Sequence, residues 1–334
     1  AHFQTFLYTG NQSSRNITLD GNSDLQPDLY WYKARNSNHH YWVDSSRGTT
    51  KYLYSSLANA EATVASAYVT SFNTNGFNVG GGDSGTNANG ISFANWAWKA
   101  NGGTTSTNND GNHTSVVQAN QDAGFSIVTY TGTGNTSSTV GHGLGVTPNW
   151  IIFKRRSGTG NWDVQIDGTS RATLNLTEAS ATNVLSSFSS TTFGLGSVTS
   201  NEKNANGSTY VAYCFAEKQG YSKFGSYVGN GNADGSFIYT GFKPAFVMMK
   251  RSDGVTNWRM FDNKRSGFNG DTSQLYPNLN NAEDSAGDQI DLLSNGFKNR
   301  TTSGDQNGSG NSYIYMAFAE NPFVTSTGIP TTAR

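Results

Sequence analysis

The sequence predicts an all-β fold, built from tandem antiparallel β-sandwich domains of the jelly-roll or lectin-like kind in three related copies. Composition gives the first indication, because 13% of the 334 residues are charged while 13% are aromatic. Long solvated helices have a higher proportion of charged residues, and disordered chains have a lower proportion of aromatic residues. The second indication is the abundance of turn-forming residues, including 39 glycines. Such residues disfavour helix interiors and favour short strands joined by tight turns.

The third indication is a set of segments that recurs three times. A strand that follows a proline and ends near a lysine occurs as "PDLYWYKAR" from Pro27, "PNWIIFKRR" from Pro148 and "PAFVMMKRS" from Pro244. Units of about a hundred residues are long enough to close cores of their own. The sequence therefore predicts β-sandwich copies at residues 1–100, 123–219 and 220–321, a polar linker at 101–122 and a C-terminal tail at 322–334.

Within each copy the elements follow one order. A strand with a Gly/Asn turn comes first ("FLYTGN", "SIVTYTGTG", "FGSYVGNG"), then the proline-led strand, then a strand bearing tryptophan ("HYWVD", "NWDVQID", "NWRMFDN"). A phenylalanine after a turn follows, and an alternating strand closes the copy ("ISFANWAWKA", "TYVAYCFAE", "YIYMAFAE"). We expect Trp42, Trp162 and Trp258 to be equivalent. Structural core positions are predicted for Trp162, Trp258, Phe77, Phe193, Phe297, Trp98, Phe215 and Phe318.

The proline-led strands are apolar on both faces. In "NWIIFK", Trp150 and Ile152 lie on one face, and Ile151 and Phe153 lie on the other. Only one face of a sheet meets the core of a two-sheet sandwich, so the second face must be covered by another copy, a loop or another subunit. We expect the copies to pack against each other or against symmetry mates, and the chain to assemble as a homo-oligomer, a trimer.

Longer segments carry a resemblance to a known family. "GFSIVTYTGTG", "VGHGLGVTPNWIIFKRRSG", "GYSKFGSYVGNG" and "AFAENPF" resemble an uncharacterised domain family of virion proteins from marine tailed bacteriophages, and the resemblance covers nearly the whole chain. It implies a structural or host-contacting role on the virion surface, in a tail fibre or capsid appendage, with other virion proteins as partners. It implies no catalytic motif. Because the chain starts without methionine, in a strand-like segment, we expect the natural chain to extend further or to have been cleaved.

Charge and hydropathy exclude several classes of partner. The net charge is −1, so the chain has no basic field for nucleic acid and no polybasic patch for a membrane surface. No apolar run approaches the ~20 residues that membrane insertion requires. Cys214 is the single cysteine, so an intrachain disulfide is impossible.

The sequence predicts no metal site and no cofactor. "NGNADG" from Asn230 matches the start of a calcium-binding loop, but Gly241 stands where the bidentate glutamate is required. A hairpin turn is the favoured interpretation. His39, His40 and His142 have no converging partners at ligand spacing, and we interpret them as surface loop residues.

Enzyme activity is not expected. Glycoside hydrolysis needs two carboxylates about 5–9 Å apart, and pairs such as Asp163 with Asp167, or Asp28 with Asp44, are among many that 23 acidic residues allow. Nucleophile motifs such as G-x-S-x-G are absent.

Binding is the remaining possibility for the aromatic residues, because their rings stack on sugars while neighbouring polar side chains fix hydroxyls. Tryptophans that recur in all copies favour a core role, whereas features of one copy suit recognition. The candidate ligand-binding residues are Tyr30, Tyr32, His39, His40, Tyr41 and Trp42.

The sequence thus predicts a non-enzymatic bacteriophage virion structural protein, a tail fibre or receptor-binding appendage that contacts the host surface and its glycans. A capsid decoration or capsid fibre protein is the alternative within this class. A carbohydrate-binding module, with an exposed platform of aromatic rings, and a polysaccharide depolymerase, with two acidic side chains in a groove, are alternatives from other classes.

Overall fold

The computed structural model describes residues 1–64, 68–81, 85–196, 202–265, 269–270, 272–285 and 287–320, with the backbone of two short strands beyond them. These two strands, β27 (Phe323–Val324) and β28 (Pro330–Thr331), pair within the predicted tail, the rest of which lies outside the described residues. The regular elements of the described residues are β-strands, and the strands of each large sheet pair antiparallel. The all-β prediction is confirmed.

The first sandwich packs a six-stranded sheet against a three-stranded one. The strand orders are β1-β9-β3-β4-β5-β6 and β2-β8-β7. The strands are β1 (Phe3–Thr9), β2 (Arg15–Ile17), β3 (Leu29–Ala34), β4 (His40–Asp44), β5 (Lys51–Tyr54), β6 (Ala62–Thr63), β7 (Val69–Asn73), β8 (Gly76–Val79) and β9 (Ser92–Trp98).

The second sandwich has an eight-stranded sheet, β10-β11-β12-β19-β14-β15-β16-β17, and a two-stranded sheet, β13-β18. Segment 101–122, predicted to be a linker, supplies the first two strands of the larger sheet and is therefore part of this sandwich. The strands are β10 (Ser106–Asn108), β11 (Ser115–Asn120), β12 (Phe125–Thr131), β13 (Thr139–Gly141), β14 (Trp150–Arg155), β15 (Asp163–Ile166), β16 (Ser170–Thr173), β17 (Ala181–Thr182), β18 (Thr192–Gly194) and β19 (Thr209–Phe215).

The third sandwich has a four-stranded sheet, β20-β26-β22-β23, and a three-stranded sheet, β21-β25-β24. The strands are β20 (Ser222–Val228), β21 (Phe237–Tyr239), β22 (Phe246–Arg251), β23 (Arg259–Asp262), β24 (Ile290–Leu293), β25 (Gly296–Asn299) and β26 (Ser312–Phe318).

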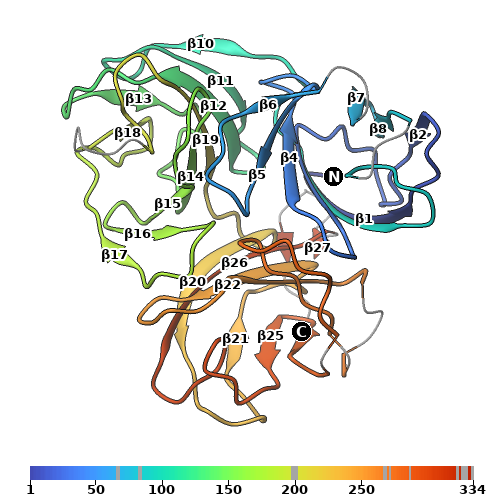
Figure 1. Cartoon of the computed structure of the whole chain (residues 1–334). Helices are drawn as coiled ribbons and strands as arrows, with labels where there is room; N and C mark the ends of the chain where they lie inside the picture. The colour runs from blue at the N-terminus through green and yellow to red at the C-terminus, as the bar shows by residue number, and fades with distance from the viewer. Residues whose placement is uncertain are drawn as a thin grey trace.

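One strand order recurs in the three large sheets. The opening strand pairs with the closing strand, which pairs with the proline-led strand and then with its successor: β1-β9-β3-β4, β12-β19-β14-β15 and β20-β26-β22-β23. Figure 1 shows the three sandwiches as lobes around one centre. The recurring segments of the sequence thus occupy the same places in the three sheets.

The register of these sheets corrects one expected equivalence. Tyr32, Phe153 and Met249 precede the three lysines, and they pair with Tyr41, Asp163 and Arg259 respectively. The residues just before those partners are His40, Trp162 and Trp258. His40, rather than Trp42, is therefore the equivalent of the two later tryptophans. The prediction was wrong because it matched residue type, whereas pairing register sets the position.

The second apolar face of each proline-led strand is buried at the centre of the chain. One buried cluster joins side chains of all three large sheets and contains all seven tryptophans. Trp98, Phe215 and Phe318, which end the three closing strands, contact each other with ring-centroid distances of 6.2, 5.5 and 5.9 Å. The copies therefore cover one another, and no symmetry mate is needed for this face.

The opposite faces form three separate cores between the large and small sheets. Phe77, Phe193 and Phe297 come from the small sheets and are fully buried in these outer cores. All eight residues assigned to the core from the sequence are buried, with at most 2% of each exposed.

The three repeated lysines are fully buried, although lysine is seldom found inside proteins. The Nζ of Lys154 donates hydrogen bonds to the carbonyl oxygens of Ala58, Arg155 and Gly160, at 3.2, 3.1 and 2.8 Å. Lys33 and Lys250 likewise donate to carbonyls of the turn that follows them. Burial lowers the pKa of Lys33 to about 7 and those of Lys154 and Lys250 to about 8.

A repeated asparagine, which was not predicted, holds the first turn of each copy. Asn87, Asn204 and Asn307 are buried, and their side-chain oxygens accept hydrogen bonds from the backbone N–H groups of Asn11, Thr133 and Asn230. An asparagine amide supplies both a donor and an acceptor, so it can hold two loops at once.

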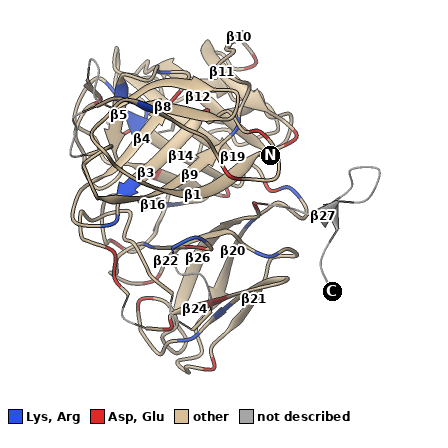
Figure 2. Cartoon of the chain, turned by 90° about the vertical axis from the view of Figure 1, so that its right-hand side faces the viewer, with Lys and Arg blue, Asp and Glu red and all other residues tan. Residues whose placement is uncertain are grey.

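Charged residues are sparse and of mixed sign along the ribbon (Figure 2). This distribution agrees with the net charge of −1. Within the described part of the chain, no helix could span a membrane.

Candidate functional site

The three sandwiches meet in a ring of three interfaces, named here by the sandwiches that they join. Each interface contains a backbone hydrogen bond at the same position. These bonds run from Glu61 N to Arg156 O (1–2 interface, 2.9 Å), from Glu283 N to Arg35 O (3–1 interface, 2.8 Å) and from Ser180 N to Ser252 O (2–3 interface, 2.8 Å). Head-to-tail contacts that close into a ring are the mark of cyclic packing.

Buried charges close the 1–2 interface. The Arg47 guanidinium pairs with Asp44, and its Nη1 lies 2.9 Å from Oε2 of Glu61. Arg156 forms a two-pronged pair with the same glutamate, at 2.8 and 3.0 Å. Tyr213 donates to Asp44 at 2.7 Å. Burial acts to raise the pKa of Glu61, but the hydrogen bonds and charges of Arg156 and Arg47 outweigh it and lower the pKa.

The same network recurs at the 3–1 interface. Arg265 lies 2.7 Å from Asp262 and 3.2 Å from Glu283. Arg35 forms the two-pronged pair with this glutamate, at 3.0 and 2.6 Å. The indole of Trp96 donates a hydrogen bond to Asp262 at 3.1 Å and so takes the place that Tyr213 has in the first network. Each network thus joins four charged side chains and one aromatic donor.

At the 2–3 interface uncharged side chains take these places. Ile166 pairs with Trp150 where the two aspartates pair with Leu29 and Phe246, so it replaces the aspartate. The backbone bond described above places Ser180 and Ser252 where the other interfaces have glutamate and arginine. This interface therefore lacks, among the described residues, the charges that fill the other two.

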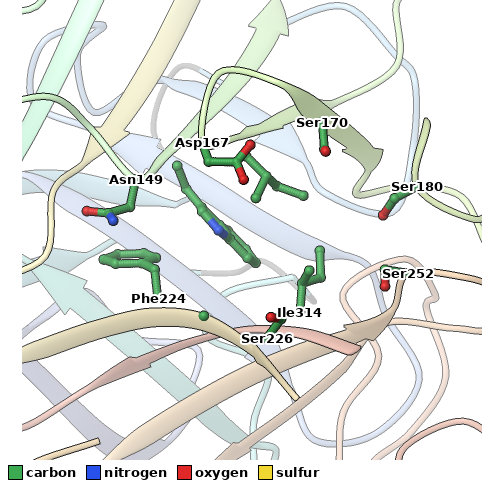
Figure 3. Close-up of a pocket in the computed structure, with 11 residues that line it drawn as sticks. Asn149, Asp167, Ser170, Ser180, Phe224, Ser226, Ser252 and Ile314 are labelled. Carbon is green, nitrogen blue, oxygen red and sulfur yellow. The ribbon is translucent and has the colours of Figure 1, made fainter. Parts of the chain in front are cut away.

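A cavity of about 300 Å³ occupies that position (Figure 3). Figure 3 shows Ser180 and Ser252 across from each other at one end, with Phe224, Ser226 and Ile314 below the opening. The lining residues are Asn149, Trp150, Ile166, Asp167, Ser170, Ser180, Phe224, Gly225, Ser226, Ser252 and Ile314. The volume lies at the lower end of the ~300–1,000 Å³ typical of small-molecule sites.

The floor of the cavity is apolar, and its rim is polar. Trp150, Phe224 and Ile314 are buried, while Asp167 and Ser226 are exposed. Trp150 and Phe224 lie with ring centroids 5.9 Å apart and planes tilted by 49°. Aromatic walls with a few oriented polar groups are typical of ligand sites.

Several polar groups of the rim have free hydrogen-bonding capacity. Thr169 donates twice to Oδ1 of Asp167, at 3.2 and 2.6 Å, and the described residues provide no donor to Oδ2. Oγ of Ser180 is buried and has no partner within the described part of the chain. Asp167 is held at φ 48°, a left-handed conformation that aspartate tolerates better than most residues.

The residues predicted from the sequence to bind a ligand lie elsewhere, and most are inaccessible. Tyr30, Tyr32, His40, Tyr41 and Trp42 are at most 4% exposed. They pack in the central cluster or in the outer core of the first sandwich, or hydrogen-bond inside it. His39 is half-buried and contacts Ser56 at 2.9 Å. The prediction of a binding surface at these residues is wrong, because features of one copy also arise from its own packing.

The other candidate chemistries also find structural roles. Asn230, Asn232 and Asp234 form successive side-chain-capped turns. These turns connect β20 with β21, which lie in different sheets, so the hairpin interpretation is wrong although the segment is a turn. His142 is buried, with its ring nitrogen 3.2 Å from the carbonyl of Ser189, which corrects its expected surface position. The described residues contain no group of three or more His, Cys, Asp or Glu side chains that could hold a metal ion.

The four carboxylates that were considered for glycoside hydrolysis have different structural roles. Asp28 and Asp44 are buried and bind backbone amides or the Arg47 guanidinium. Asp163 is buried beside Lys203, at 3.3 Å. Asp167 alone among the four lines the cavity.

A pair of exposed aromatic side chains marks a second surface. Phe237 and Tyr239 are 47% and 56% exposed on the same face of β21. The Phe237 ring lies over Gly296 of the neighbouring strand, where a Cβ would come within 3.0 Å of it. This two-ring surface belongs to the third sandwich, away from the residues predicted for binding.

The signal that could have located the cavity is short. "DSSR" (44–47) and "DNKR" (262–265) share an aspartate and an arginine three residues apart, and "IDGT" (166–169) lacks both at those positions. Comparison of the chain with curated proteins and with solved structures finds no match. A family model described as a domain of unknown function, DUF7483, matches residues 1–322. The chain therefore belongs to the DUF7483 family.

Proposed function

We propose that the chain is a non-enzymatic surface module of a bacteriophage virion, a receptor-binding part of a tail fibre or appendage that contacts the host through the cavity at the 2–3 interface. The observation that carries this proposal is that two equivalent interfaces are filled by charges, while the third has small side chains and a cavity lined by free polar groups. An open pocket with aromatic walls and a few polar groups, at one of three otherwise repeated interfaces, is typical of a ligand site.

The central core supports a rigid module. Three sandwiches that share one aromatic cluster cannot separate without exposing tryptophan side chains to water. The expected trimer rested on apolar faces that the chain itself covers. We therefore propose a monomeric module that gains multivalency from the particle that carries it.

Decoration of the capsid is the second proposal within this class. The exposed pair Phe237 and Tyr239 favours it, because exposed aromatic rings suit contact with another protein. A depolymerase is less well supported, since the cavity lining includes one carboxylate, Asp167, whereas glycoside hydrolysis uses two.

Labelling of intact virions tests the proposal. Fab fragments raised against the purified chain should label the tail in electron micrographs and reduce adsorption of the phage to its host. Labelling of the capsid, with adsorption unchanged, would support decoration instead. No labelling of the particle would reject a virion role.

A further inference from the structure

We infer that the cavity between the second and third sandwiches binds one uncharged sugar ring of a host surface polysaccharide. This ring is either the terminal sugar or an internal sugar of the polysaccharide chain. This inference rests on the proposed receptor-binding function and names its ligand.

The floor suits the apolar face of a pyranose. Trp150 and Phe224 form a bent aromatic surface, with Ile314 beside them. The C–H groups on one face of a sugar ring pack on such rings, while its hydroxyls point outward. A volume of about 300 Å³ limits the ligand to about one or two rings.

The rim suits hydroxyl groups. Ser170, Ser226 and Ser252 place three hydroxyls around the opening, and that of Ser252 already donates to the Ser312 carbonyl at 3.1 Å, which leaves it available as an acceptor. A serine hydroxyl both donates and accepts hydrogen bonds, as do the hydroxyls of a sugar. The free Oδ2 of Asp167 adds an acceptor for a sugar O–H.

Two polar groups are held in place before any ligand binds. Asn149 Oδ1 accepts a hydrogen bond from Glu217 N at 2.7 Å, which leaves its amide N–H₂ available. Asp167 N donates to Asn149 O at 2.9 Å, and this bond fixes the two residues side by side. Fixed donors and acceptors reduce the entropy lost on binding.

The charges of the lining exclude the main alternatives. The lining contains no lysine or arginine, and Asp167 would repel a uronate, a sialic acid or a phosphate. A quaternary ammonium would fit two rings and one carboxylate, but it would leave the serine hydroxyls without partners. An uncharged sugar uses the rings, the hydroxyls and the carboxylate together.

The test uses the whole chain and neutral monosaccharides. The probes are the methyl glycosides of glucose, galactose and mannose, and N-acetylglucosamine, with glucuronate and choline for comparison. Saturation-transfer NMR and calorimetry should detect at least one neutral sugar, with a dissociation constant of about 1 mM, as expected for a ligand of this size. The inference would be overturned if glucuronate or choline bound more strongly than every neutral sugar. It would also be overturned if no neutral sugar bound at concentrations up to about 50 mM, roughly 50 times the expected dissociation constant.

A double substitution closes the cavity with side chains that the chain already uses. Ser180→Glu with Ser252→Arg recreates the Glu61–Arg156 pair at the 2–3 interface. Sugar affinity should fall at least 10-fold while the melting temperature stays within a few degrees. Phe237→Ala with Tyr239→Ala is the control and should leave sugar affinity unchanged. Unchanged affinity in the closed variant, or a 10-fold loss in the control, would contradict the assignment.

Asp167→Asn provides a second variant that keeps the shape of the rim. Asparagine, like aspartate, tolerates the left-handed conformation that Asp167 adopts, so the backbone should keep its shape. We expect a several-fold loss of sugar affinity, and wild-type affinity would count against a role for the carboxylate. Fab inhibition of adsorption combined with no sugar binding would reject the sugar assignment but retain the receptor-binding function. Sugar binding without virion labelling would do the reverse.

Discussion

The 1–2 interface and the 2–3 interface are built on the same strand order and the same backbone hydrogen bond, yet one is filled by ion pairs and the other encloses a cavity. Arg47 and Glu61 fill the first, whereas Ile166, Ser180 and Ser252 leave space in the second. The difference shows that the repeated backbone holds the ring together at all three interfaces. The side chains between the sandwiches are then free to differ.

The two kinds of interface differ in specificity as well as in space. Buried ion pairs contribute little net stability, but they penalise arrangements in which either charge loses its partner. At the 2–3 interface, the apolar pair Ile166 and Met316, both in the central cluster, stands where aspartate meets Tyr213 or Trp96. Apolar contacts are less directional, so a pocket beside them can change shape at lower cost.

The largest effect should come from the element that both interfaces share. Trp98→Ala removes one of three mutually contacting rings at the centre and should destabilise the chain by about 4 kcal/mol. Urea unfolding measures this change. Val255→Ala, at a residue that is 75% exposed, is the control and should cost less than about 0.5 kcal/mol. A small effect of Trp98→Ala would mean that the sandwiches unfold independently.

Removing one charge from the filled interface should have the next largest effect. Arg47→Met leaves Asp44 buried without its partner and should cost about 3 kcal/mol. Arg251→Met is the matched control, because its partner Asp253 is at the surface, and it should leave stability nearly unchanged. Equal losses for the two variants would show that the networks are no more important than a surface pair.

Stability should rise with pH in the range where the repeated lysines differ from unfolded lysine. Burial lowers the pKa of Lys33 to about 7 and those of Lys154 and Lys250 to about 8, while unfolded lysine titrates near 10.4. Between pH 8 and pH 9 the unfolded lysines therefore hold protons that the folded lysines have released. The free energy of unfolding should increase over this range, by about 1 kcal/mol for each lysine.

Denaturant titrations at pH 7, 8, 9 and 10 measure this dependence. Lys250→Met should reduce the slope, because it removes one of the three titrating groups. Above about pH 9 the trend should reverse, since burial raises the pKa of Cys214, Tyr30 and Tyr213 and the unfolded groups ionise first. A stability that is flat from pH 7 to pH 9 would show that the lysines stay charged, held by their carbonyl partners.

The smallest effect on stability should come from filling the open interface. Ser180→Glu with Ser252→Arg should change the free energy of unfolding by less than about 1 kcal/mol, because the pair would be partly exposed at the rim. A double-mutant cycle separates the pair energy from that of each substitution. A loss above about 2 kcal/mol would show that the two backbones at the 2–3 interface do not match those at the 1–2 interface.

Much of the fold could be predicted from the sequence, because repeated strands and turns are local signals. The proline-led strands and the buried phenylalanines were found where they were expected. The equivalence of Trp42 with Trp162 and Trp258 was wrong. His40 holds the equivalent position, and Trp42, two residues later, matches only in residue type. Copy-specific aromatic residues of the first sandwich were taken for a surface because the sequence does not show which face is covered.

The candidate site could not be predicted in the same way. Its lining comes from the second and third sandwiches, and its distinction lies in what is missing relative to pairs such as Arg156 with Glu61 or Arg35 with Glu283. These partners are 95 and 248 residues apart. Contacts over such separations have no local signature, so the absent pair at the 2–3 interface has none either.

The sequence by itself determined the all-β class, the threefold recurrence and the need to cover a second apolar face, because periodicity and composition act within a few residues. The tertiary structure decided that the copies cover one another around Trp98, Phe215 and Phe318, and which interface remained open. Burial is a property of the assembled surfaces. Whether a side chain fills a core, balances a charge or borders a cavity depends on neighbours that the chain brings together only when it folds.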